Sequence, residues 1–201
     1  MIVLLTVLLP VVGAGLVLLL RKNENAREAA TLLTGVITFA HVLALLRLVR
    51  AGESPSLDIL EVVPDVWLSF EVEPLGMVFA LVAGFLWPVT SLYAIGYMRG
   101  HHEKNQTRFF FFFAIAIAGA MGVAFSANLF TLFVFYEFLT FCTVPLVTHH
   151  QTDEAKKSAK SPVAINALSI KMAGAIRVKW PMPFVRKKMP LVVLYQWKWG
   201  K

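Results

Sequence analysis

The sequence contains very little cysteine and few charged residues for its length. Cys142 is the single cysteine among 201 residues, so no disulfide can form within the chain, and we interpret it as a small packing residue. Charged residues make up 15% of the chain, whereas hydrophobic residues make up 58% and the mean hydropathy is +0.69. A soluble domain of this size is less apolar. The composition therefore predicts an all-α, polytopic membrane protein.

Acidic residues are absent from the last fifth of the chain. Residues 161–201 carry eight Lys/Arg and no Asp/Glu, whereas residues 1–160 carry eleven Lys/Arg and twelve Asp/Glu. We therefore divide the chain into an N-terminal membrane region, 1–160, and a basic aromatic tail, 161–201. The tail could lie on an anionic membrane surface or grip RNA, although it contains no nucleic-acid motif. The abrupt change in composition favours a third interpretation, a truncation or a reading-frame shift.

Five apolar runs approach the length of about 20 residues that a membrane-spanning helix requires. They cover residues 2–20, 29–49, 74–98, 109–125 and 128–148. The longest connection between them, 50–73, is acidic, and its alternating segment VWLSFEV at 66–72 predicts a short hairpin. In the fourth run, Gly119 and Gly122 are expected to let a neighbouring helix approach closely.

The distribution of lysine and arginine predicts the orientation in the membrane. The connections at 21–28, 99–108 and 149–160 each contain three basic residues, whereas the acidic connection has only Arg50 as a clear basic residue. Because short cytoplasmic loops are enriched in Lys and Arg, we expect these three connections on the cytoplasmic side. The N-terminus and the acidic connection then face outward.

Glu137 lies almost at the midpoint of the fifth run and is the only acidic residue there. A charge at the bilayer centre costs about 2.5–3.5 kcal/mol on insertion scales, so such residues face a protein interior or a water-filled path. We expect Glu137 to exchange protons. The alternative is a structural carboxyl that is neutral and hydrogen-bonded to a neighbouring helix.

His41 and Tyr136 are accessory candidates for proton transfer. Histidine titrates near neutral pH, but we favour the interpretation of His41 as a polar residue that is hydrogen-bonded between helices. A metal-dependent membrane enzyme is a further alternative, with the histidines His101, His102, His149 and His150. Their positions give no spaced ligand set, so we predict neither a metal site nor a cofactor.

Three phrases resemble the antiporter-type subunits shared by respiratory NADH:quinone oxidoreductase and Mrp-type multisubunit Na⁺/H⁺ antiporters. They are YAIGYM at 93–98, RFF at 108–110 and NLFTLFVFYE at 128–137. Order and spacing are similar to those of the family over roughly residues 1–160, most of all to the D-type subunit of Mrp antiporters. The resemblance implies the N-terminal part of a subunit with about fourteen helices.

The resemblance also implies a role for Glu137 as the essential carboxylate of the first half-channel. In relatives this carboxylate is coupled to a lysine on a later helix. None of the following lysines lies in a run of membrane length, so none is assigned as that partner: Lys171, Lys179, Lys187, Lys188 and Lys198. The chain by itself is therefore not expected to conduct protons.

The sequence thus predicts a subunit, or its N-terminal fragment, of a monovalent cation/proton antiporter in the inner membrane of a bacterium. Its expected partners are other membrane subunits, protons, monovalent cations and the lipid bilayer, and not nucleic acid. Two alternatives remain: a membrane-arm subunit of NADH:quinone oxidoreductase, which would make it part of an enzyme, and a non-transporting membrane scaffold.

Overall fold

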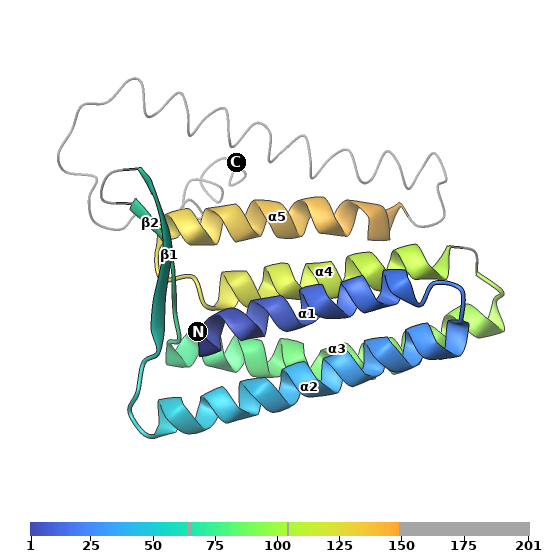
Figure 1. Cartoon of the computed structure of the whole chain (residues 1–201), viewed down its shortest axis with the longest axis horizontal. Coiled ribbons are helices and arrows are strands. Elements are labelled where there is room, and N and C mark those ends of the chain that lie inside the picture. Colours follow the sequence, from blue (N-terminus) through green and yellow to red (C-terminus); the bar gives the residue numbers. More distant parts are fainter. Residues whose placement is uncertain (64–65, 104, 149–201) are drawn as a thin grey trace, which may run out of the picture. The chain divides into compact units, whose positions relative to one another are not determined.

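The computed structural model describes residues 1–63, 66–103 and 105–148. These residues form five α-helices and one hairpin, all of them shown in Figure 1. In chain order the elements are α1 (Ile2–Leu19), α2 (Glu24–Arg50), β1 (Ser56–Val63), β2 (Val66–Glu71), α3 (Pro74–Gly100), α4 (Gln106–Ala124) and α5 (Leu129–Val147). Each helix is long and apolar enough to cross a membrane, which confirms the predicted polytopic helical fold.

Two connections that are predicted to be polar loops are partly helical. α2 begins at Glu24, because the side chain of Asn23 caps it and accepts a hydrogen bond from the N–H of Ala26 (3.3 Å). The predicted loop 21–28 is therefore wrong from Glu24 onward. α3 continues through Gly100 and α4 starts at Gln106, which shortens the predicted loop 99–108. The predicted loop 149–160 and the tail 161–201 lie outside the described residues.

Each helix packs side by side with one or more of the others. α1 contacts α2 and α4, α3 contacts the same two helices, and α5 packs on α4 and on β2. The hydroxyls of Thr31, Thr34 and Thr38 each donate to a backbone carbonyl one turn earlier in α2. These buried polar groups are thereby satisfied within their own helix, as an apolar surrounding requires.

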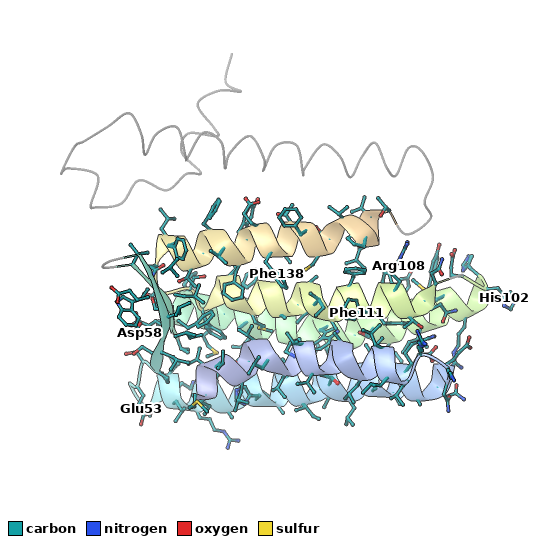
Figure 2. All side chains as sticks on the ribbon, turned by 45° about the horizontal axis from the view of Figure 1, so that its top comes forward. Glu53, Asp58, His102, Arg108, Phe111 and Phe138 are labelled. Carbon is teal, nitrogen blue, oxygen red and sulfur yellow. The ribbon has the colours of Figure 1, made fainter. Side chains whose placement is uncertain are left out.

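The interface between α4 and α5 depends on two glycines. A Cβ at Gly119 would lie 3.2 Å from Cδ1 of Phe138 and 3.3 Å from Cα of Leu139, and a Cβ at Gly122 would collide with the ring of Phe135. The predicted close approach at Gly119 and Gly122 is confirmed. Figure 2 shows Phe138 between these two helices.

The predicted hairpin is confirmed and lies across one end of the helices (Figure 1). β1 and β2 pair antiparallel, with irregularities in register between Asp58 and Leu60 and between Glu61 and Val63. Phe70 of β2 is 1% exposed, and its ring lies 5.3 Å from that of Phe135 in α5. An aromatic contact of this kind fixes the hairpin against the bundle.

The two ends of the bundle carry different charges. Figure 2 shows Glu53 and Asp58 at the hairpin end and His102 at the opposite end. The acidic connection and the connections at 20–23 and 101–105 therefore lie at opposite ends of the described helices, and the predicted orientation in the membrane stays a prediction.

Candidate functional site

α5 starts at a capped N-terminus that is joined to the hairpin. Asn128 Oδ1 accepts a hydrogen bond from the N–H of Thr131 (2.8 Å), which satisfies one of the free donors of the first turn. The amide nitrogen of the same side chain donates to Trp67 O and to Ser69 Oγ, at 2.7 Å each. One side chain thus caps α5 and holds β2.

Backbone hydrogen bonds strengthen this junction. The N–H of Ser69 donates to the hydroxyl of Thr131 (3.0 Å), and the N–H of Ala127 donates to Ser69 O (3.0 Å). The N–H of Glu71 donates to Phe125 O (2.9 Å) at the end of α4. Because Ser69 and Thr131 are buried, water does not compete for these bonds. The junction sets the depth and the rotation of α5.

Asn128→Ala is expected to lower the free energy of unfolding by about 2 kcal/mol, because it removes a helix cap and two further hydrogen bonds. Amide exchange across 66–71 should speed up, measured in detergent micelles by hydrogen–deuterium exchange. Asn23→Ala is the matched control, since it removes the cap of α2 without touching the hairpin. Equal exchange at 66–71 in the two variants would contradict the anchoring role of Asn128.

Glu137 is buried in the middle of α5. It lies eight residues after Leu129, which is about 12 Å along the helix and close to the middle of a bilayer core. The side chain is 8% exposed, and its Oε2 has no hydrogen-bond partner within the described part of the chain. A buried carboxyl oxygen is normally hydrogen-bonded, as an acceptor when the group is ionised or as a donor when it is protonated.

Glu137 faces away from α4. Phe135 and Leu139 lie two residues before and after it, and both contact the glycines of α4. Residues two apart on a helix are separated by about 200°, so Glu137 lies on the opposite side from both. α5 packs on α4 and β2 among the described elements. The carboxyl therefore lies on the side of α5 away from α4, and the alternative of a hydrogen bond to α4 gains no support.

The structure does not bring His41 to Glu137. His41 is on α2, and its Nε2 lies 2.9 Å from Ile2 O at the start of α1. α2 packs on α1 and α3, whereas α5 packs on α4. Tyr136 directly precedes Glu137 on α5. Its side chain is 51% exposed and points about 100° away from that of Glu137 around the helix axis. A role for His41 or Tyr136 in proton transfer stays a prediction.

Sequence reasoning missed a buried ionic cluster at the end of the bundle away from the hairpin. Arg27 is 4% exposed and Glu28 is 5% exposed, although both fall in a predicted loop. Glu28 accepts two hydrogen bonds from the guanidinium of Arg99 on α3, and Arg27 donates to Gln106 (2.7 Å) and Thr107 (3.0 Å) of α4. The capping residue Asn23 was the signal that could have placed these residues inside a helix.

Comparisons with known proteins show what this chain resembles. The family model for the N-terminus of chain 5 of NADH-ubiquinone oxidoreductase (complex I) matches residues 64–110, which include β2, α3 and the start of α4. Two proteins of Staphylococcus aureus, from strains MRSA252 and JH9, bear the name "Putative antiporter subunit mnhD2". Each is 26% identical to this chain over 164 residues, which are 82% of this chain and 32% of the relative. The chain thus spans about a third of the length of these relatives.

A solved structure shares the fold. A chain of the membrane-bound sulfane sulfur reductase, an archaeal respiratory membrane complex, superposes with a TM-score of 0.66 at 21% identity, over 87% of this chain and 26% of that chain. The five packed helices with their hairpin thus share the fold of a part of that chain.

The motifs and the matches point in the same direction. Over a part of their length, the chain is similar to the antiporter-type subunits shared by complex I and multisubunit cation/proton antiporters.

Proposed function

We propose that the chain forms the N-terminal part of a subunit of a multisubunit monovalent cation/proton antiporter. In this proposal Glu137 takes up and releases protons in a transmembrane half-channel. The main support is the buried carboxyl at mid-membrane depth, with an unpartnered oxygen on the side of α5 away from α4. An intramembrane ionisable residue of this kind is by default part of an ion pathway.

The site needs a partner cation that the described helices do not supply. Within the described residues, Arg27, Arg99 and Arg108 lie near the helix ends, and no Lys or Arg lies on α5. A lysine on a further helix, as the family resemblance implies, would approach Glu137 on the side of α5 away from α4. Its approach would stabilise the carboxylate, and its withdrawal would favour the protonated acid. Such a pair can load and unload a proton without any cofactor.

The antiporter relatives favour this function over a respiratory one. They match most of the chain, whereas the complex I family model matches residues 64–110, a segment that stops before α5. A membrane-arm subunit of NADH:quinone oxidoreductase is the second candidate, because that match carries its description. Both candidates use Glu137 in the same way, and they differ in whether exchange depends on a cation or on quinone reduction.

The test is a chimera in which residues 1–148 replace the corresponding part of the Staphylococcus aureus antiporter subunit, ending at the C-cap of α5. We expect the chimera to assemble with the other subunits, measured by co-purification. We also expect it to restore Na⁺- or K⁺-dependent collapse of a pH gradient in everted membrane vesicles. An assembled chimera without any cation-dependent exchange would favour the scaffold and overturn the proposal.

For the location we propose the inner membrane of a bacterium, with the hairpin outside and the loops at 20–23 and 101–105 in the cytoplasm. The acidic residues of the hairpin and the basic residues at the other end of the bundle support this orientation.

A further inference from the structure

A hollow of about 470 Å³ opens between the end of α1 and the start of α4. Its volume lies within the range of about 300–1,000 Å³ that is common for ligand pockets. The hollow lies toward the end of the bundle away from the hairpin, where Figure 2 shows Arg108 and Phe111. It is separate from the surroundings of Glu137, which lies in the middle of α5.

One side of this hollow is basic. Arg21 follows α1 and Arg108 is in the first turn of α4, so the fold brings together two guanidinium groups that are far apart in the sequence. Arg108 also donates to Thr148 O (3.4 Å), which holds its guanidinium at the edge of the hollow. Of the described residues that line it, none is an aspartate or a glutamate.

Thr107 adds a hydroxyl donor to the basic side. Its Oγ1 accepts a hydrogen bond from Arg27 (3.0 Å), so its own hydroxyl proton remains available to a ligand. Arg27 is 4% exposed, so its charge lies behind Thr107 in a region of low dielectric. The carboxylate of Glu28, 3.7 Å away, offsets much of that charge, so the attraction for an anion comes mainly from Arg21 and Arg108.

The other side of the hollow is apolar. Leu18 comes from the last turn of α1, and Phe111 and Phe112 come from the second turn of α4. These side chains lie on the membrane-facing side of the basic residues, because both helices continue from there into their apolar spans. A small anion such as free phosphate would bind the arginines and leave this apolar surface uncovered.

We propose that the hollow binds an anionic phospholipid, with its phosphate between Arg21 and Arg108 and the start of an acyl chain on Leu18 and Phe112. An occupant needs a negative head and an apolar body joined at one point, and a membrane phospholipid has that chemistry. Basic pockets between membrane helices near the cytoplasmic surface bind anionic headgroups for this reason. The lipid would join α1 to α4, and its binding does not depend on transport by Glu137.

Native mass spectrometry of the full chain in detergent tests the proposal, with phosphatidylglycerol and phosphatidylcholine of identical acyl chains as probes. Wild type should retain phosphatidylglycerol at least tenfold better than phosphatidylcholine. Arg21→Gln/Arg108→Gln should abolish that preference, because each basic side chain contributes about fivefold near an anionic lipid. Arg47→Gln/Arg50→Gln is the matched control, since it removes the same charge at the hairpin end and should leave the preference unchanged.

Two further arms keep the test decisive. Arg21 is exposed, so Arg21→Gln alone should fold normally and reduce retention of phosphatidylglycerol about fivefold, with folding checked by circular dichroism. Inorganic phosphate at millimolar concentration should displace little of the lipid. Equal retention of the two lipids by wild type, an equal loss in the Arg47/Arg50 control, or full displacement by inorganic phosphate would each overturn the proposal.

Discussion

Glu137→Gln in the assembled chimera is expected to reduce cation-dependent proton exchange by about 10²-fold or more, the contribution that is typical of a positioned proton-transfer group. Glutamine keeps the size of the side chain and can make hydrogen bonds, but it cannot take up or release a proton at any accessible pH. Exchange is measured as the collapse of a pH gradient on addition of Na⁺ or K⁺ to everted vesicles. Assembly of the complex should be unchanged, because glutamine has the same size and Glu137 lies on the side of α5 away from α4.

The controls for this variant separate charge from position. Glu53→Gln removes a carboxylate from the exposed hairpin end and should leave the rate of exchange within about twofold, since exposed charges are screened by water and salt. Glu137→Asp retains a titratable group but withdraws it by one methylene, so an intermediate rate is expected. Normal exchange in the glutamine variant would show that the protons take another route, and the proposed function would then lose its central residue.

The membrane spans and the position of Glu137 could be predicted from the sequence because both follow from local composition. Runs of about 20 apolar residues are decided by the cost of placing backbone and charges in lipid, and that cost does not depend on neighbouring helices. The closeness of α4 and α5 was also predictable, because glycines at 119 and 122 leave room for a second backbone. The direction in which Glu137 points was not, since periodicity is weak when every side of a helix is apolar.

The start of α2 shows why the ends of the helices were predicted less well. Glu24, Arg27 and Glu28 look like a hydrated loop by composition, but Asn23 caps a helix that buries two of them. Their burial depends on Arg99, which is more than 70 residues away, and on the first turn of α4. Partners at that separation cannot be predicted from the local sequence pattern. The burial of Arg27 and Glu28 is therefore decided by the tertiary fold.

Glu28→Ala is expected to lower the free energy of unfolding by about 3 kcal/mol. Loss of one partner from a buried ion pair costs about 3–5 kcal/mol, and the lower end applies because the Arg99 side chain is 47% exposed and can be hydrated. Arg27 cannot escape to water in the same way, since its side chain is 4% exposed and lies 3.7 Å from Glu28. Unfolding of the full chain in detergent, followed by circular dichroism, measures the change.

Three variants decide whether the charge of Glu28 is the cause. Glu24→Gln is the matched control on the same helix, and it should change stability by less than about 1 kcal/mol because Glu24 is exposed. Glu28→Gln should fall between wild type and Glu28→Ala, since an amide oxygen still accepts one hydrogen bond from Arg99. Arg27→Met/Glu28→Leu should recover most of the loss, because an apolar pair leaves no uncompensated charge in the interior. If that double variant is less stable than Glu28→Ala, the hydrogen bonds from Arg27 to Gln106 and Thr107, and not the balance of charge, hold α2 against α4.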